Sequence, residues 1–252
     1  LLPSGGFAGG VNAWSGRARV LGLYFLNNQR EARNIEMNKK IIIFDMDGVL
    51  FDSIPYAEKS FLESHPGVTS EMYKELHSGN YHEEAKKYSH LKKEETDEER
   101  TKRSLAYAEK KKETPMFEGI EALLRDLHDL GYVLVVNTNA FDRNCLPLLE
   151  RAGIKSLFDL VASAEFSKSK IEKFKLIEEK YGVGKNDMLF ITDALGDVKE
   201  AEIAEVPTAV VTWGVHDESF FKREEHSNLI GIFHTVAELQ TLLQSMHENR
   251  NI

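Results

Sequence analysis

The sequence predicts an α/β protein with a doubly wound parallel sheet that is interrupted after its first strand by a helical insert. Short apolar runs recur along the chain, helix-like segments lie between them, and residues 53–116 have helical spacing without a convincing strand. Such alternation is typical of a parallel sheet covered by helices on both faces. We therefore expect an α/β core made of residues 37–52 and 117–252, and a helical cap made of residues 53–116.

The expected strands are short and rich in Val, Ile, Leu and Phe. They are residues 41–45, 132–138, 158–162, 188–193 and 208–212. Between them, apolar residues at three- and four-residue steps precede Gly131 and Gly182. Because glycine readily adopts the left-handed backbone that ends many helices, we expect both glycines to be C-terminal caps.

Two segments outside this alternation have a simpler interpretation. Residues 1–36 show weak periodicity, so we expect a flexible N-terminal extension, with the working protein starting at Met37. Within the insert, Glu94–Lys112 interleaves opposite charges, and the run Lys110–Lys112 is flanked by acidic residues. This pattern favours a solvated helix with near-neighbour ion pairs over a nucleic-acid patch.

Composition excludes several classes of protein. Hydrophobic residues make up 42% and charged residues 29% of the 252 residues, which is typical of a folded globular chain. The net charge of -9 argues against nucleic-acid binding. The single cysteine, Cys145, cannot form an internal disulfide, and the apolar stretch Val20–Leu26 is too short to span a membrane. We expect a cytoplasmic protein without membrane or nucleic-acid partners.

The first expected strand leads into Asp45-Met46-Asp47-Gly48, where two carboxylates lie close to a turn that glycine permits. In open α/β sheets, ligands bind beyond the carboxyl ends of the strands. A single pair of this kind is weak support, because it is also common in ordinary turns.

Polar residues follow the later strands in the same way. Thr138 and Asn139 follow the second strand, Lys168 follows the third, and Asp193 closes the fourth, with Asp197 one turn further on. Carboxylates suit a hard cation or act as a nucleophile, and a hydroxyl and an ammonium bind phosphate oxygens. The combination predicts a phosphoryl-transfer site.

Together these residues resemble the four motifs of the haloacid dehalogenase superfamily, specifically its members with a helical cap after the first motif. The resemblance runs from about Ile41 to Leu243 and rests on Asp45-x-Asp47-Gly48, Thr138-Asn139, Lys168 and Asp193-x-x-x-Asp197. It implies a Rossmann-like core. The interval between Lys168 and Asp193 is the family's usual one, with Lys170 as the alternative if the local alignment shifts. Ser169 departs from the family, in which many members have proline after the motif lysine.

The resemblance also implies a role for each residue. Asp45 would attack phosphorus, as an ordinary carboxylate ionised at neutral pH, and Asp47 would be the general acid and base. Thr138, Asn139 and Lys168 would bind the phosphate group. Mg²⁺ would be bound by Asp45, the Asp47 backbone carbonyl and Asp193, while Asp197 would be an outer-shell ligand or the partner of Lys168.

These roles predict a phosphatase that hydrolyses a small phosphorylated metabolite, with Mg²⁺ as cofactor. Because dehalogenating members of the family do not keep the second aspartate, the resemblance at Asp47 implies phosphoryl transfer rather than carbon–halogen cleavage. A sugar phosphomutase similar to β-phosphoglucomutase is the alternative, and a receiver-like signalling domain or a silent binding module is less favoured. The segment Ser78–His82 interrupts the helical pattern of the insert, and we favour a turn between helices over a specificity loop.

Overall fold

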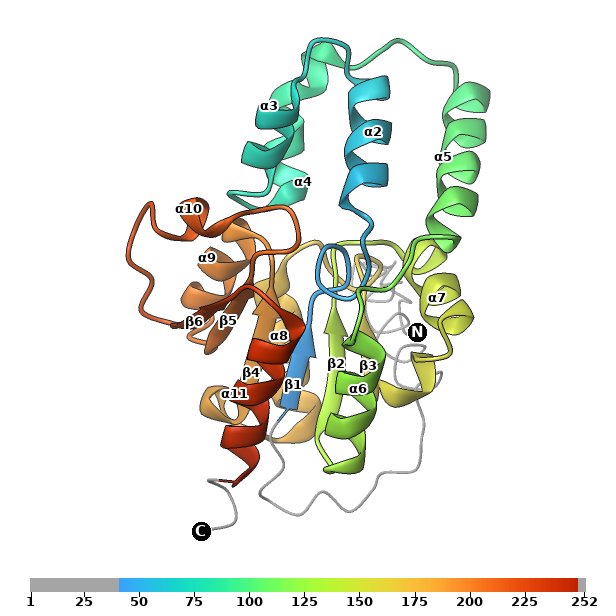
Figure 1. Ribbon diagram of the computed structural model, residues 1–252. Coiled ribbons are helices and arrows are strands. Elements are labelled where there is room, and N and C mark those ends of the chain that lie inside the picture. The colour runs from blue at the N-terminus through green and yellow to red at the C-terminus, as the bar shows by residue number, and fades with distance from the viewer. Residues whose placement is uncertain (1–40, 249–252) are drawn as a thin grey trace, which may run out of the picture. The chain divides into compact units, whose positions relative to one another are not determined.

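The computed structural model describes residues 41–248, so the expected extension at 1–36 and Met37 lie outside the described residues. Six parallel strands form one sheet in the order β3-β2-β1-β4-β5-β6 (Figure 1). The strands are β1 Ile41–Phe44, β2 Val133–Asn137, β3 Leu160–Ala162, β4 Met188–Thr192, β5 Thr208–Val211 and β6 Leu229–Phe233. The predicted doubly wound parallel sheet is therefore confirmed.

The strands of the sheet centre form where the sequence has uninterrupted apolar runs. Every residue of β1, β2, β4 and β5 is buried, because helices cover both faces of the sheet. β1 lies between β2 and β4, and Phe44 pairs with Val136 on one side and Ile191 on the other. This register brings the carboxyl ends of the three strands to one edge.

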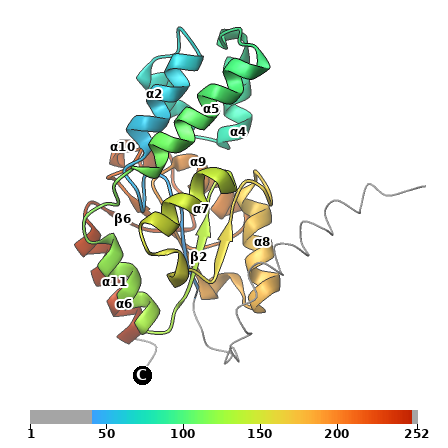
Figure 2. The same ribbon diagram turned by 90° about the vertical axis from the view of Figure 1, so that its right-hand side faces the viewer.

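Helices cover the two faces of the sheet. α6 and α11 lie on one face and α8 on the opposite face (Figure 2), and α8 packs beside α9. The elements are α6 Ile120–Asp129, α7 Asp142–Arg151, η2 Lys155–Leu157, α8 Lys170–Tyr181, η3 Lys185–Asp187, α9 Leu195–Ile203, α10 Glu218–Phe221 and α11 Val236–Glu248. Gly131 and Gly182 have φ values of 80° and 63°, as the expected helix ends require. None of the helices among residues 41–248 is long and apolar enough to cross a membrane.

The edge strand β6 was not predicted from the sequence. Its residues are only partly buried, Ile230 is exposed, and Gly231 interrupts the apolar run. Glycine in a strand weakens the pattern, so a half-covered edge strand leaves little signal in the sequence.

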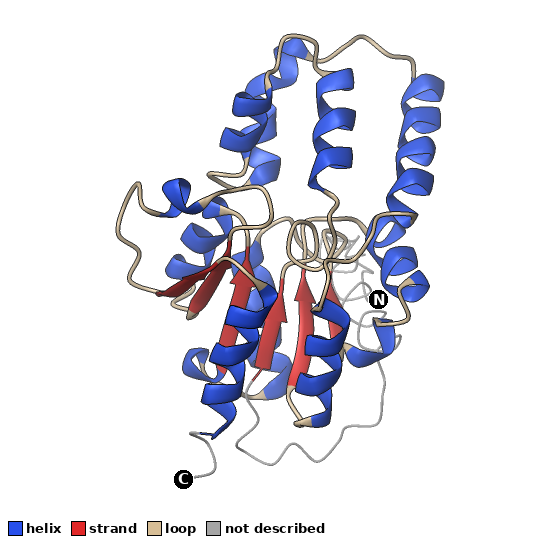
Figure 3. Ribbon diagram, in the orientation of Figure 1, coloured by secondary structure: helices blue, strands red, loops and turns tan. Residues whose placement is uncertain are grey.

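The insert is helical, as predicted, and none of the six strands lies within residues 53–116 (Figure 3). Its elements are α2 Ile54–Ser64, α3 Ser70–Leu76, α4 Tyr81–Glu84, η1 Ala85–Leu91 and α5 Asp97–Lys112. Phe61, Tyr73 and Leu76 form a small apolar core of its own. α5 begins with a reciprocal cap between Thr96 and Glu99.

The turn between α3 and α4 of the insert is in contact with the N-terminus of α9. Gly196 N donates a hydrogen bond of 2.7 Å to His77 O, and a Cβ atom at Gly196 would lie 2.1 Å from Gly79 O. Because no other residue type fits at that distance, Gly196 permits the close approach of the two backbones. The predicted turn at Ser78–His82 is thus an interhelical turn that also touches the core.

Candidate active site

Three neighbouring strands supply the polar residues of the site. Asp45 follows β1, Thr138 follows β2 and Asp193 follows β4. The Asp45 amide donates to Ile191 O at 2.9 Å and the Thr138 amide to Ala162 O at 3.0 Å, so both residues continue the sheet. As predicted, these groups lie together at the carboxyl edge of the sheet.

Asp45 is buried and its carboxylate is held on two sides. Its Oδ1 accepts a hydrogen bond from Met46 N at 2.7 Å and lies 3.1 Å from Lys170 Nζ. The pKa of Asp45 is raised to about 7, first because the carboxyl group is buried, although Lys170 opposes the shift, and further because Asp197 lies near. That is higher than the ordinary carboxyl pKa assumed from the sequence.

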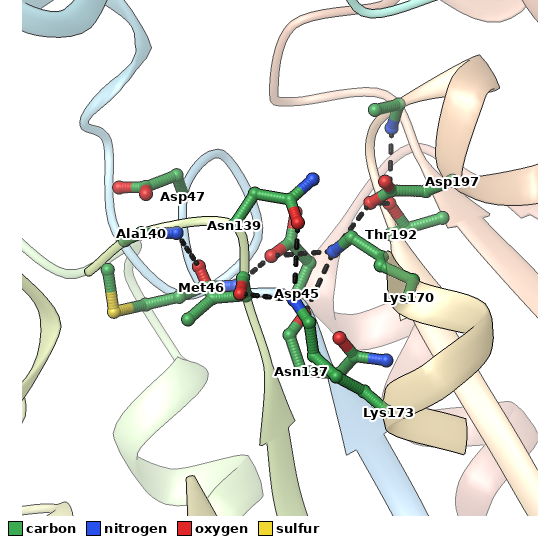
Figure 4. Close-up of polar contacts among 12 residues, drawn as sticks. Asp45, Met46, Asp47, Asn137, Asn139, Ala140, Lys170, Lys173, Thr192 and Asp197 are labelled. Carbon is green, nitrogen blue, oxygen red and sulfur yellow. Dashed lines mark hydrogen bonds and ion pairs between the residues drawn. The ribbon is translucent and has the colours of Figure 1, made fainter. Parts of the chain in front are cut away.

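The lysine beside Asp45 is Lys170, and the prediction of Lys168 for this position was wrong. Lys168 is exposed in the loop before α8, and its backbone carbonyl accepts a hydrogen bond from Asn80 Nδ2 at 2.9 Å. Lys170 begins α8, is only 1% exposed, and extends toward Asp45 and Asp197 (Figure 4). Lys170 is the residue that the sequence offered as the alternative, and it lies two residues closer to Asp193 than Lys168 does.

Lys170 is bound by three oxygen atoms. Its Nζ lies 3.1 Å from Asp45 Oδ1, 2.8 Å from Asp197 Oδ2 and 2.8 Å from Asn137 O. Burial alone would lower the pKa of Lys170, but the charges of Asp197 and Asp45 outweigh burial and raise it. Lys170 is therefore a fixed cation.

Asp197 is the partner of this lysine. Thr192 Oγ1 donates a hydrogen bond of 2.7 Å to Asp197 Oδ2, which also faces Lys170 Nζ. Asp197 was predicted to be an outer-shell ligand or the partner of Lys168, and its lysine partner is Lys170 instead.

A second buried lysine, Lys173, was not predicted. It lies one turn after Lys170 on α8, and its Nζ donates to Thr138 O at 2.6 Å and to Asn139 Oδ1 at 3.2 Å. Burial, and then the charge of Lys170, lower the pKa of Lys173 to about 7. Thr138 Oγ1 in turn accepts from Ala140 N at 3.1 Å, so Lys173 helps to hold the loop that contains Thr138 and Asn139. Lys173 could have been found from the sequence because it lies three residues after Lys170, on the same face of a predicted helix.

Asp47 lies beside the two connections between the core and the insert. Ser53 Oγ, just before α2, donates to Asp47 Oδ1 at 2.5 Å. Lys111 Nζ, near the end of α5, lies 2.7 Å from both carboxylate oxygens of Asp47. Lys111 is only 3% exposed, so the assignment of this run to a solvated face was wrong for Lys111. Burial would lower the pKa of Lys111, but the charge of Asp47 outweighs it and raises the pKa.

Asp193 completes a pair of buried carboxylates with Asp45. Its Oδ2 accepts a hydrogen bond from Val215 N at 2.7 Å, and Cβ atoms at Gly48 and Gly214 would lie 1.9 Å and 2.1 Å from that oxygen. Gly48 also has a φ of 78°, so this close packing requires glycine. Burial, and then the charge of Asp45, raise the pKa of Asp193.

This arrangement fits Mg²⁺. Two buried carboxylates that repel each other are compensated when a hard cation binds them. Among residues 41–248, no three His, Cys, Asp or Glu side chains are grouped to hold a metal ion. A cation here would therefore use Asp45 and Asp193 with a backbone carbonyl and water, as Mg²⁺ commonly does.

Glu200 is a further buried acid that was not predicted from the sequence. Its Oε1 accepts from Lys170 N at 3.0 Å and Ser169 Oγ at 3.1 Å, and its Oε2 accepts from Asn80 Nδ2 at 3.1 Å. Glu200 thereby caps the first turn of α8 and joins it to the insert. Glu200 contacts residues at least 30 positions away in the sequence, and a local sequence pattern does not predict such contacts.

A cleft of about 540 Å³ opens above these residues and is lined from both the core and the insert. Its floor contains Asp45, Asp47, Thr138, Asn139, Asp193 and Asp197. Gly79, Tyr81 and His82 of the α3–α4 region also line it, as does His77. The site is thus a pocket between the core and the insert, with the carboxylates on the side of the core.

Comparisons with known proteins show which chains this one is similar to. Residues 42–211 match the family model of the haloacid dehalogenase-like hydrolases. A phosphoglycolate phosphatase from Aliivibrio fischeri is 25% identical over 193 residues, which cover 69% of this chain and 85% of that protein.

Solved structures show the same fold. A predicted phosphatase from Clostridium acetobutylicum has a TM-score of 0.64 and 23% identity, and the match covers 82% of this chain and 99% of that one. CbbY from Rhodobacter sphaeroides, in complex with phosphate, has a TM-score of 0.64 and 19% identity over 80% and 96% of the two chains. The comparisons confirm the family resemblance and the α/β core with its parallel sheet.

Proposed function

This chain belongs to the haloacid dehalogenase-like hydrolases and is a phosphatase of that family, and we propose that it hydrolyses a small-molecule phosphate monoester through an aspartyl-phosphate on Asp45. The observation that carries the proposal is the environment of Asp45. This carboxylate lies at the base of the cleft, beside the fixed cation Lys170 and two residues from a second carboxylate. Such a set supplies a nucleophile, charge neutralisation and a proton carrier.

In the first half-reaction a carboxylate oxygen of Asp45 attacks phosphorus, and the bond from phosphorus to the leaving oxygen breaks. Protonated Asp47 donates its proton to that oxygen, so the product leaves as an alcohol. Lys170 neutralises charge on Asp45 and on the transferring group. Thr138 and Asn139, in the loop that Lys173 holds, bind the non-bridging oxygens.

In the second half-reaction Asp47, now a carboxylate, takes a proton from water as the water oxygen attacks phosphorus. The bond between phosphorus and Asp45 breaks, phosphate leaves, and Asp47 is protonated again. Ser53 and Lys111 hold the Asp47 carboxylate from the two ends of the insert, so we propose that the insert serves as a cap over this step.

Mg²⁺ would be held by Asp45, Asp193 and the Asp47 backbone carbonyl, and when bound it would offset the charge of the carboxylates and of the phosphate. The neutral forms that burial favours for Asp45 and Asp193 would then be replaced by carboxylates.

A sugar phosphomutase would share the first half-reaction, and hydrolysis separates the two functions. A phosphatase releases inorganic phosphate from its phosphoenzyme in water without any sugar acceptor. We expect such release from this chain, because a relative that it matches over 85% of that protein's length is a phosphoglycolate phosphatase.

The assignment of Lys170 gives a direct test with a matched control. Lys170→Met should lower kcat for p-nitrophenyl phosphate by about 10²–10³-fold, the loss that accompanies removal of one transition-state charge partner. Lys168→Met, two residues away and exposed, should change kcat less than about twofold. Steady-state assays of both purified variants check this. A large loss in Lys168→Met with near-parental activity in Lys170→Met would restore the original motif assignment.

Asp193→Asn should chiefly raise the Mg²⁺ concentration required for half-maximal activity. The amide removes one anionic oxygen ligand, while Val215 N still finds an oxygen acceptor at that position. We expect an increase of roughly tenfold or more in a Mg²⁺ titration, with activity partly recovered at high Mg²⁺. An unchanged titration curve would exclude Asp193 as a ligand.

A further inference from the structure

The cleft continues from the carboxylates into the insert, between α2 and α5. From α5 it is lined by Arg100, Arg103, Ser104, Tyr107 and Lys111, and from α2 by Ile54, Ala57, Ser60, Phe61 and Ser64. Within each set, residues three or four positions apart repeat along the helix. This spacing places each set on one face of its helix. Two helix faces therefore form the walls of an elongated channel.

α5 gives this channel a length scale. Lys111 marks its base, because its ammonium contacts Asp47. An α-helix rises about 1.5 Å per residue, so Tyr107, Arg103 and Arg100 lie roughly 6, 12 and 16 Å from Lys111 along the axis. A ligand with its phosphate at Asp45 would meet the tyrosine first and the arginines last.

All the charged side chains that the insert contributes to the channel are basic. Residues 53–116 contain thirteen Asp and Glu residues, yet none of these thirteen lines the cleft, whereas Lys92, Arg100, Arg103 and Lys111 do. The acidic side chains of the insert are all directed elsewhere. Apart from the carboxylates at its base, the cleft is therefore cationic.

The two arginines are paired with acids to different degrees. Glu95 accepts from Arg103 Nε at 2.8 Å and Arg103 Nη2 at 2.9 Å, which fixes the guanidinium plane. Arg100 lies 3.2 Å from Asp97, whose side chain is 96% exposed. Solvent screens that pair, so Arg100 keeps most of its attraction for an anion.

We propose that the channel binds a phosphate monoester with an elongated leaving group that ends in a second anionic group, carboxylate or phosphate, at Arg103 and Arg100. The proposal rests on the proposed function, because that function puts the scissile phosphate at Asp45. Phe61 and Tyr107 would contact the apolar or ring-shaped middle of the ligand. A two-carbon acid such as phosphoglycolate would end near the first turn above Lys111, leaving both arginines without a partner.

The test uses ω-phosphooxy carboxylates of two, four, six and eight carbons, beside alkyl phosphates of the same lengths. We expect kcat/KM to rise with length only in the carboxylate series, until the long members exceed their alkyl counterparts by about 10- to 100-fold, the value of a hydrogen-bonded charge pair. A second series of the same lengths, ending in phosphate instead of carboxylate, shows which terminal group gives the higher kcat/KM. A flat series, with p-nitrophenyl phosphate still hydrolysed, would overturn the proposal and leave the proposed function intact.

The variant Arg100→Met should remove most of that advantage through KM while leaving turnover of p-nitrophenyl phosphate unchanged, and Arg103→Met should do the same. Arg125→Met is the matched control, because Arg125 pairs with Glu121 on α6. Calorimetry with non-hydrolysable ω-phosphono carboxylates measures the affinity of the channel without turnover. If the long ligands bind more tightly than the short ones and Arg100→Met removes this difference, the channel is supported even if no ester is hydrolysed. Equal binding by the parent and the variant would contradict it.

Discussion

Asp45→Asn is expected to abolish hydrolysis of p-nitrophenyl phosphate, with a loss of more than about 10⁴-fold in kcat. The amide has no anionic oxygen to attack phosphorus, and it also removes a proposed ligand of the cation. Because the covalent bond to phosphorus is proposed to form on Asp45, no other side chain should replace it.

The same substitution should leave the fold intact. The charge of Asp197 contributes to the raised pKa of Asp45, and the charge of Asp45 contributes to the raised pKa of Asp193. A neutral amide at position 45 therefore relieves repulsion, and Lys170 keeps Asp197 and Asn137 O as partners. We expect a thermal midpoint equal to or above that of the parent. The control Asp129→Asn changes a side chain that is 84% exposed on the surface and should retain full activity. Residual turnover of Asp45→Asn within tenfold of the parent would exclude the covalent mechanism.

Asp47→Asn is expected to lower steady-state turnover by about 10²–10⁴-fold, the usual contribution of a general acid or base. The two half-reactions should respond differently. p-Nitrophenolate is a good leaving group that needs little protonation, so Asp45 can still be phosphorylated, whereas water attack lacks its base.

Rapid-mixing kinetics show this difference directly. The variant should release about one equivalent of p-nitrophenolate in a burst and then turn over slowly, while the Mg²⁺ requirement stays close to that of the parent, since the Asp47 backbone carbonyl is unchanged. Phenyl phosphate, a poorer leaving group, should give no burst. A uniform slowing of both substrates without any burst would instead place Asp47 in a structural role.

The parts of the fold that could be predicted are those with a local signal. β1, β2 and β4 are buried on both faces and appear in the sequence as continuous apolar runs, and Gly131 and Gly182 mark helix ends. The edge strand β6 is half-covered and contains Gly231, so its pattern resembles that of a loop.

In the site, the residues at strand ends could be predicted, because the sheet register alone brings them together. The choice between Lys168 and Lys170 could not be made. It depends on where α8 begins, and Glu200, far along the chain, accepts the hydrogen bond from Lys170 N at that start.

Lys111 was misjudged for a similar reason. The three lysines of its run look alike in sequence, and only the position of α5 over Asp47 buries the middle one. Contacts of this kind are set by how the insert lies on the core, which local charge patterns do not encode.

Transfer of a phosphoryl group to Asp45 can be detected on the variant in which the phosphoenzyme accumulates. Asp47→Asn is mixed with p-nitrophenyl phosphate and Mg²⁺, quenched in acid during the burst, and digested for mass spectrometry. We expect one phosphoryl group on the peptide that contains Asp45, and none when Asp45 is also changed to Asn. A phosphoryl group on another residue, or none while p-nitrophenolate is released in a burst, would contradict it.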